Sequence, residues 1–493
     1  MGPVKVNAGS YEGWLDKAGA DFIDDAALRA ALSAPAPAPG RVREILARSL
    51  EVSEALPPED TAALLAVEDP ELLEEMFGAA RAVKKKVYDN RVVTFAPLYA
   101  ANSCVNNCLY CGFRTGNRRA ARRMLSAEEI KAEAGALAGR IGHKRLIFVT
   151  GEHPSTGADY IAEALRTIYS VKVPTRRGFG QIRRVNVNAA PMTVPDLRKL
   201  KEAGIGTYQV FQETYDRALY SRLHPGDTPK ADYRWRLYVM HRAFEAGIDD
   251  VALGALFGLN PDWKFEVMGL VAHARELEAR FGIGPHTISF PRLESADGTA
   301  LPAESLRNVP DEAFRRLVAV LRLSVPYAGM IVTARERPEV IRSVIPMCTQ
   351  RDASTRIGIG AYSDRYAGQE AERQQFLLGD TRSLDEVIGE LAEMGHITSF
   401  CTSGYRCGRT GDHIMKLLKS GHESRFCKLN AVLTFREWLD DFASDATKAK
   451  GEALIEKEIA EIKARSAHFP PETVKLLDSY YARIGGGERD LCF

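Results

Sequence analysis

The sequence predicts an α/β protein in which eight parallel strands and their connecting helices close into a (β/α)8 barrel of the TIM type, with helical extensions before and after it. From about residue 91 onward, short apolar, β-branched runs alternate with longer helical patterns, which is typical of βαβ units and a parallel sheet. Eight such runs are present, the number that this kind of barrel requires. They span residues 92–98, 145–150, 184–189, 208–212, 250–256, 287–291, 330–334 and, more weakly, 347–353.

The chain divides into three predicted segments. Residues 1–88 show helical periodicity, broken by a connector at residues 33–40 in which alternating prolines fix φ and remove backbone donors. We therefore expect a helical N-terminal extension there. Residues 89–363 contain the barrel runs, and residues 364–493 predict a C-terminal helical domain with a candidate auxiliary cluster site.

Two connecting helices carry their own start signals. Ser126 is followed three residues later by Glu129, and Ser383 by Glu386. This spacing lets the serine and the glutamate satisfy each other's backbone N–H groups, as in a capping box. A helix is therefore predicted to begin directly after each serine.

The bulk composition excludes several partners. The 493 residues include 66 Lys plus Arg against 65 Asp plus Glu, so no overall field favours nucleic acid or an acidic membrane surface. No apolar run approaches the length of a membrane span, and the first residues lack the apolar core of a signal peptide. Eight cysteines in a chain of this size fit a reducing compartment. We therefore expect a soluble, cytoplasmic protein.

Three cysteines follow the first barrel run in a Cys-x3-Cys-x2-Cys spacing, at Cys104, Cys108 and Cys111. Free cysteines are often buried, but core thiols do not gather on a polar, asparagine-rich loop. A closed zinc site would need four ligands. Three thiolates can instead hold a cube of four irons and leave one iron open for an outside chelator. This loop is the predicted chemical centre of the chain.

Polar and charged side chains recur where successive runs end. In this kind of barrel the C-terminal strand ends and the loops after them carry the reactive groups, and each such group is costly to bury without a partner. We therefore expect these residues to line one site rather than to be ordinary solvated loop residues. They are Thr150, Gly151 and Glu152 after run two, Asn186 and Asn188 in run three, Glu213 after run four, Arg292 after run six and Arg335 after run seven.

The cysteine loop, with Tyr110 inside its last pair, resembles the cluster loop of radical S-adenosylmethionine (SAM) enzymes. Residues from about 84 to 450 closely resemble the tyrosine lyases that mature FeFe-hydrogenases, the HydG family, which are relatives of the 2-iminoacetate synthase of thiamine biosynthesis. Besides the cysteine loop, the segments that carry this resemblance are residues 91–99, 184–188, 206–215, 223–225, 284–289 and the region around Cys401.

The resemblance implies a 4Fe-4S cluster held by Cys104, Cys108 and Cys111, with SAM chelated to its open iron. It further implies reductive cleavage of SAM to a 5′-deoxyadenosyl radical, which takes a hydrogen atom from the amino group of L-tyrosine. Cleavage of the Cα–Cβ bond would then give p-cresol and dehydroglycine, also called 2-iminoacetate. A reductant protein such as a ferredoxin or flavodoxin is the implied partner.

Individual roles follow from position in the resemblance and from the barrel rule. The substrate carboxylate needs a cation, and Arg335 is the candidate because a guanidinium forms a two-pronged pair with a carboxylate. The alternative is a salt bridge to Glu336 or to another neighbouring residue. The segment from Thr150 to Glu152 resembles the element that holds the SAM amino group, and Tyr110 is expected against the adenine. The expected cofactor-binding residues are Tyr110, Thr150, Gly151, Glu152, Asn186 and Asn188, and the expected catalytic residues are Arg335, Glu213 and Arg292.

The hydrogenase maturases also convert dehydroglycine to CO and cyanide on a second cluster, held by a C-terminal Cys-x2-Cys-x22-Cys motif. Cys401 and Cys427 match its first and last positions, but Gly404 occupies the middle one and Cys407 follows three residues later. Either Cys407 completes a cluster of altered geometry, helped by nearby glycines, or the site is degenerate and the chemistry stops at the lyase step. The resemblance also suggests that His286 helps to hold an extra iron there; the alternative is a histidine bonded within the barrel floor.

Two further interpretations stay open. The radical chemistry could act on tryptophan or another amino acid, because the sequence alone does not identify side chains that bind a phenol hydroxyl. The changed C-terminal motif also allows a non-catalytic iron carrier or scaffold that has kept the fold and lost turnover. Formation of 5′-deoxyadenosine separates this carrier from every enzymatic interpretation.

Overall fold

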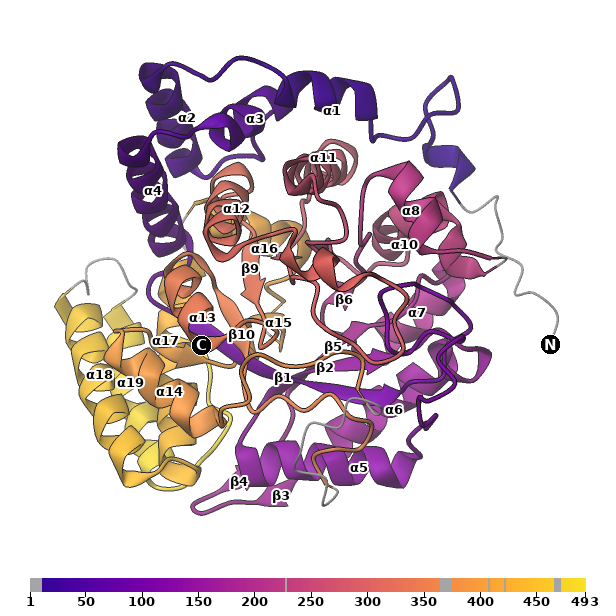
Figure 1. Cartoon of the computed structure of the whole chain (residues 1–493). Coiled ribbons are helices and arrows are strands. Elements are labelled where there is room, and N and C mark those ends of the chain that lie inside the picture. The colour runs from indigo at the N-terminus through magenta and orange to yellow at the C-terminus, as the bar shows by residue number, and fades with distance from the viewer. Residues whose placement is uncertain (1–10, 227, 364–373, 407, 421–422, 465–470) are drawn as a thin grey trace.

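The computed structural model describes the chain except for residues 1–10, 227, 364–373, 407, 421–422 and 465–470. Eight parallel strands form a closed barrel, in which the last strand pairs back onto the first (Figure 1). One strand lies in each of the eight predicted runs, so the predicted barrel is confirmed. The strands are β1 (Val92–Ala101), β2 (Arg145–Thr150), β5 (Arg184–Asn188), β6 (Tyr208–Gln209), β7 (Val251–Gly254), β8 (Thr287–Ser289), β9 (Gly329–Val332) and β10 (Gln350–Asp352).

The barrel closes at β1, where Val93 lies beside Gln350 of β10. A further short strand, β11 (Thr398–Ser399), pairs in parallel with the first residues of β1. The antiparallel hairpin of β3 (Val173–Pro174) and β4 (Phe179–Gly180) forms a separate sheet. The sequence does not predict these three strands, because two residues are too few to show a period of two.

Helices surround the barrel, so the strands are buried on both faces, as is typical of parallel sheets. Ser126 and Ser383 each accept a hydrogen bond from the backbone N–H three residues later, and the glutamate there bonds back, so both predicted capping boxes are confirmed. The helices around the barrel are α5 (Ala127–Ala136), α6 (Ala158–Ser170), α7 (Val194–Glu202), α8 (Arg217–Leu223), α9 (Tyr233–Leu237), α10 (Val239–Glu245), α11 (Trp263–Phe281), α12 (Asp311–Ser324), α13 (Pro338–Val344) and α14 (Leu384–Glu393).

The N-terminal helices pack on the outside of the barrel, beside α11 and α12 (Figure 1). A backbone hydrogen bond from Leu56 to the carbonyl of Ser324 (2.7 Å) ties this extension to the end of α12. Three of the helices begin at a proline. Proline lacks a backbone N–H, but this costs no hydrogen bond in the first turn, where N–H groups have no acceptor within the helix. The four helices are α1 (Asp25–Leu32), α2 (Pro39–Glu51), α3 (Pro58–Ala66) and α4 (Pro70–Tyr88).

The C-terminal helices are fixed to the barrel by a buried group of charges. Glu437 pairs with Lys144 (3.0 Å) and Arg183 (2.9 Å), and all three side chains are buried. Burial alone would raise the pKa of Glu437, but the charges of Arg183 and Lys144 hold this pKa at about 2. Because these two cations directly precede β2 and β5, Glu437 anchors its helix at the amino ends of those strands. The C-terminal helices are α15 (Ser403–Arg406), α16 (Gly411–Lys419), α17 (Glu423–Asp441), α18 (Asp445–Ala464) and α19 (Pro471–Gly485).

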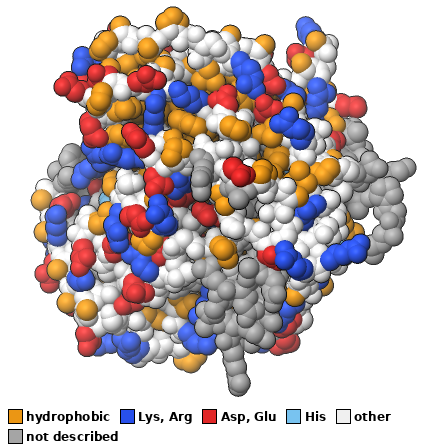
Figure 2. All heavy atoms as spheres, viewed as in Figure 1, with side chains coloured by type: hydrophobic (Ala, Val, Ile, Leu, Met, Phe, Trp, Pro, Cys, Tyr) orange, Lys and Arg blue, Asp and Glu red, His pale blue; other side chains and the backbone are white. Residues whose placement is uncertain are grey.

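The outer surface carries charges of both signs. Figure 2 shows lysine and arginine side chains interspersed with aspartate and glutamate over the face viewed there. In the part of the chain that the structure describes, no helix is both long enough and apolar enough to cross a membrane.

Candidate active site

The loop after β1 borders a cavity of about 160 Å³ at the carboxyl end of the barrel, named here the first cavity. Backbone hydrogen bonds tie this loop to distant elements: the N–H of Val105 donates to the carbonyl of Glu152 (2.8 Å), and that of Leu109 to the carbonyl of Leu223 (3.0 Å). Residues that follow β2, β5, β6, β7, β8, β9 and β10 also line it. Residues at several strand ends and the cysteine loop thus border one cavity.

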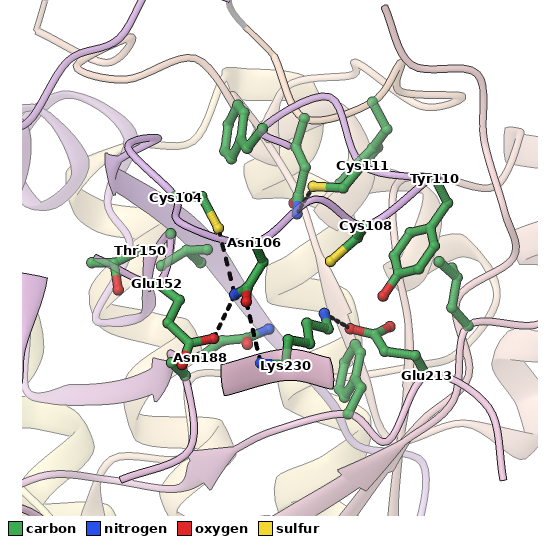
Figure 3. A pocket seen from close by; sticks show the side chains of 18 of the residues that line it. Cys104, Asn106, Cys108, Tyr110, Cys111, Thr150, Glu152, Asn188, Glu213 and Lys230 are labelled. Atoms are coloured by element: carbon green, nitrogen blue, oxygen red, sulfur yellow. Dashed lines mark hydrogen bonds and ion pairs between the residues drawn. The ribbon is translucent and has the colours of Figure 1, made fainter. Parts of the chain in front are cut away.

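Cys104, Cys108 and Cys111 all line the first cavity (Figure 3). Burial and the charges of the neighbouring thiols raise the pKa of Cys108 to about 12, although a nearby lysine opposes this. The side-chain amide of Asn106 donates to Sγ of Cys104 (3.7 Å), and that of Gln375 donates to Sγ of Cys111 (3.5 Å). The three sulfurs thus line one space, and amide donors hold two of them, those of Cys104 and Cys111.

This donor set suits an iron–sulfur cluster better than a single ion. Among the described residues, no three His, Cys, Asp or Glu side chains lie close enough together to hold a single metal ion. The described lining of the first cavity contains three thiols and no fourth. A 4Fe-4S cluster with one open iron needs three thiolate ligands, which these cysteines can supply.

The segment after β2 lies close behind the cysteine loop. Thr150, Gly151 and Glu152 all line the first cavity. A Cβ atom at Gly151 would lie 2.4 Å from the carbonyl oxygen of Ser103, so any side chain there would push the loop away from β2. Beside it, the carboxylate of Glu152 accepts a hydrogen bond from the side chain of Asn106 (2.6 Å). The missing side chain of Gly151 thus lets the segment after β2 pack closely against the cysteine loop, with the Glu152 carboxylate in the same cavity as the cysteines.

Tyr110 forms part of an apolar wall of the same cavity. Its hydroxyl lies 2.8 Å from Nε2 of His224, and burial raises the pKa of this hydroxyl well above its usual value. Asn188, the last residue of β5, lies beside Val149 of β2 and also lines the cavity. An aromatic ring among leucines suits the adenine that the resemblance places there. The surrounding apolar residues are Leu219, Leu223, Leu256, Leu259 and Leu293.

Glu213 lies in the first cavity, but two cations neutralise it. It has a φ of 73°, in the left-handed region, and its carboxylate pairs with Lys230 (2.8 Å) and Arg236 (3.3 Å). Burial alone would raise its pKa, but these charges hold the pKa of Glu213 at about 2. It therefore stays ionised near neutral pH and can orient a bound group, but it is a poor proton acceptor. The sequence analysis missed Lys230 and Arg236, which follow no strand end.

Arg335 directs its charge at the first cavity. Its guanidinium stacks on the ring of Phe376, 3.3 Å from the ring centroid. The salt bridge to Glu336 that the sequence left open is not formed, because Arg292 bonds both oxygens of that carboxylate (2.9 and 3.0 Å). In the described part of the chain, no carboxylate lies within ion-pairing distance of Arg335. This arrangement suits an anionic ligand.

Two of the predicted site residues do not line the first cavity. Arg292 pairs with Glu336 and does not itself line the cavity. Asn186 lies within the barrel, where its side-chain oxygen accepts a hydrogen bond from the N–H of Thr207 (3.0 Å). It precedes Asn188 by two residues on the same strand, which places it about 7 Å deeper at the usual rise per residue.

A second cavity, of about 40 Å³, lies at the opposite end of the barrel. His286 before β8, Cys401 after β11 and Cys427 on α17 all line it. Gly404 lines it too, and a Cβ atom there would meet its nearest neighbour at 3.8 Å, an ordinary contact. Cys407, the remaining predicted ligand, lies outside the described residues. The structure thus brings together two of the three predicted cysteines and the histidine.

Comparison with known proteins gives the class. The family described as the Radical SAM superfamily matches residues 98–268, and the Biotin and Thiamin Synthesis associated domain matches residues 289–397. The 2-iminoacetate synthases of Salmonella typhimurium and Escherichia coli are each 30% identical to this chain, over 68% and 72% of it and 85% and 89% of their own length. The chain belongs to the radical SAM superfamily.

Within that superfamily, the chain is similar to HydG, a maturase of the [FeFe]-hydrogenase. One HydG crystal structure has a TM-score of 0.88 and 43% identity, covering 96% of this chain and 100% of that one. HydG from Carboxydothermus hydrogenoformans has a TM-score of 0.72 and 35% identity, covering 90% and 94%. These similarities confirm the predicted resemblance to the HydG maturases.

Proposed function

We propose that this chain is a radical SAM lyase that cleaves the Cα–Cβ bond of L-tyrosine to p-cresol and dehydroglycine. The observation that carries the proposal is Arg335, a cation in the same cavity as the three cysteines and without an acidic partner among the described residues. A buried charge is costly unless it is paired, and the α-carboxylate of an amino acid would pair it. Similarity to proteins named 2-iminoacetate synthase supports dehydroglycine as a product.

The first cavity would bind its cofactors through the residues described above. When bound and reduced, the cluster and SAM supply the 5′-deoxyadenosyl radical that takes a hydrogen atom from the substrate's amino group. The protein binds, orients and excludes water. The cluster ligands would be Cys104, Cys108 and Cys111, and the SAM-binding residues Tyr110, Thr150, Gly151, Glu152 and Asn188.

The side chains nearest the substrate have distinct tasks. Arg335 would hold the α-carboxylate by two parallel hydrogen bonds, which fixes the orientation of the amino group. Glu213 would stay charged and orient bound polar groups. Phe376, under the Arg335 guanidinium, would help to keep water from the radical.

One incubation tests the proposal. The anaerobically reconstituted protein, given dithionite, SAM and L-tyrosine, should form p-cresol and 5′-deoxyadenosine. L-Tryptophan in a parallel reaction tests the altered substrate, and iron binding without any 5′-deoxyadenosine would favour the iron carrier. We propose a ferredoxin or flavodoxin as the physiological donor, which should replace dithionite in the same assay.

Conversion of dehydroglycine to CO and cyanide is a second candidate function. The shared cavity of Cys401, Cys427 and His286 favours it. Only two of the three thiolates that such a cluster needs are among the described residues, so the third would have to come from Cys407. Detection of CO and cyanide in the parent but not in Cys407→Ala supports this function. Formation of p-cresol without CO or cyanide restricts the protein to the lyase step.

A further inference from the structure

Two side chains of opposite charge line the first cavity without pairing. Glu294 lies in the loop after β8, and Arg335 lies in the loop after β9, the neighbouring strand. Neither forms an ion pair with any described residue. Each nevertheless shifts the pKa of the other, so the two lie near enough to act on one ligand.

The surrounding ion pairs explain this arrangement. Arg292 bonds both oxygens of Glu336 and also pairs with Asp311 (2.9 Å), so these groups satisfy one another. Arg335 stacks on Phe376 instead of reaching Glu336. Because Glu336 is paired with Arg292, it does not bind the neighbouring Arg335, whose guanidinium lines the first cavity instead.

The Glu294 carboxyl differs from the other acids of this region. It is half-buried, and no described side chain hydrogen-bonds it. Burial and the negative charge of Glu336 raise the pKa of Glu294 to about 7, against the opposing charges of Arg335 and Arg292. It can therefore take up and release a proton near neutral pH, whereas the pKa of Glu213 is held at about 2.

We propose that Glu294 is the base that takes a proton from the substrate's α-ammonium group while Arg335 holds the α-carboxylate. This inference rests on the proposed function, in which the radical takes a hydrogen atom from the amino group. One N–H bond breaks, its electron pair stays on nitrogen, and the proton forms an O–H bond on Glu294, so no oxidant or reductant is consumed. The resulting neutral amine is the form from which the imine dehydroglycine can be made.

The geometry supports this pairing of tasks. An amino acid carries its ammonium and carboxylate on one carbon, so its receptor needs an acid and a cation side by side but not bonded to each other. Glu294 and Arg335 line the same cavity, after two neighbouring strands, and do not form an ion pair with each other. Glu213 and Glu336 do not, because each is neutralised by its own cations.

The test compares the parent holoenzyme with Glu294→Gln and with Glu304→Gln, an exposed acid in the loop after β8. Each SAM-loaded, unreduced protein is titrated calorimetrically at pH 8 with L-tyrosine and with 3-(4-hydroxyphenyl)propionate, which lacks the amino group. We expect Glu294→Gln to bind L-tyrosine about tenfold more weakly, the order of one hydrogen bond to a charged group. Binding of the analogue should not weaken, and Glu304→Gln should behave as the parent.

A pH profile supplies a second readout. In the parent, kcat for p-cresol should rise with pH through about 7, as the Glu294 carboxyl ionises, and this rise should be absent from Glu294→Gln. If that variant does not fold, Glu294→Asp should keep the rise with a lower kcat. The inference is overturned if the rise persists in Glu294→Gln or is missing in a folded Glu294→Asp. It is also overturned if Glu294→Gln loses equal affinity for L-tyrosine and for the analogue.

These results separate the inference from the proposed function. A parent that binds L-tyrosine but forms no p-cresol contradicts the lyase and, with it, the role of the base. A parent that forms p-cresol, together with a Glu294→Gln variant of unchanged kcat, pH profile and preference for L-tyrosine, contradicts only the inference.

Discussion

The first and second cavities lie at opposite ends of the same barrel, and they are assembled in different ways. The three cysteines of the first cavity come from one short loop after β1. The second cavity takes His286 from just before β8, Cys401 from the segment after β11 and Cys427 from α17. A local loop brings its thiols together by chain connectivity, whereas the second site exists only while the C-terminal helices are docked. The first site should therefore tolerate changes that the second does not.

The largest expected effect is the loss of all chemistry in Cys108→Ala. Two remaining thiolates do not hold a cube, so the variant should lose about four irons and form no detectable 5′-deoxyadenosine. Iron and sulfide analysis and chromatography of the reaction measure both. Cys492→Ala, near the C-terminus, is the matched control and should keep the parent's iron. SAM cleavage by Cys108→Ala would contradict the role given to the loop.

The second cavity should depend on a residue that the first does not need. Cys407→Ala should lose about four irons, the content of one cube, and all CO and cyanide, while p-cresol formation continues. Adding Gly404→Cys should restore the iron, because that position lines the cavity and has space for a side chain. If Cys407→Ala keeps the iron content of the parent, the second site does not use this thiol.

Arg335→Lys tests the substrate side of the first cavity. A lysine cannot form the two-pronged pair or the flat stack on Phe376, so kcat/KM for L-tyrosine should fall about 100-fold, as for loss of a charged hydrogen bond in a partly buried site. The iron content should not change. Arg337→Lys, whose exposed side chain pairs with Asp311 and Glu339, is the control. A normal KM in Arg335→Lys would place the carboxylate elsewhere.

Glu437→Gln should reduce iron binding at the second cavity before it affects the first. It removes the buried acid between Lys144 and Arg183 and should cost about 3–5 kcal/mol of unfolding free energy, measured by denaturant titration. Because the folded pKa of about 2 lies below the usual value near 4.5, this stabilisation is present above pH 4.5 and is lost as the pH falls toward 2.

The variant should therefore show less acid sensitivity than the parent. Partial unfolding should also release iron from the second cavity at a denaturant concentration that leaves 5′-deoxyadenosine formation intact. Glu456→Gln, exposed on α18, is the control. If iron release from the second cavity and loss of 5′-deoxyadenosine formation occur at the same denaturant concentration, the two sites do not differ in their dependence on the C-terminal helices.

The sequence predicted the elements whose signal is local. The barrel strands appear as apolar runs because a parallel sheet is buried on both faces, and both capping boxes can be recognised from two residues at fixed spacing. Thr150, Glu152 and Arg335 were predicted as cavity residues because strand ends in such a barrel share one face. In each case one short segment contains the whole signal.

Contacts between distant segments were not predictable in this way. Lys230 reaches the first cavity from the segment between α8 and α9, and Gln375 reaches it from far along the connection between β10 and α14. Arg292 obeys the strand-end rule and yet turns to Glu336, because a charge is stabilised more by a near carboxylate than by a cavity. Asn186 faces the barrel interior, as Asn188 does, but lies too deep to reach the first cavity.

By itself, the sequence determined that this chain forms a (β/α)8 barrel with three thiols presented on one loop, because strand period and cysteine spacing are properties of neighbouring residues. Tertiary structure alone decided which charges face the first cavity and which neutralise one another. It placed Arg335 and Glu294 in one cavity, without an ion-pair partner among the described residues, and brought Cys427 to His286 through the docking of α17. The reason is physical: the stability of a buried charge depends on the partner nearest in space, and position along the chain does not specify that partner.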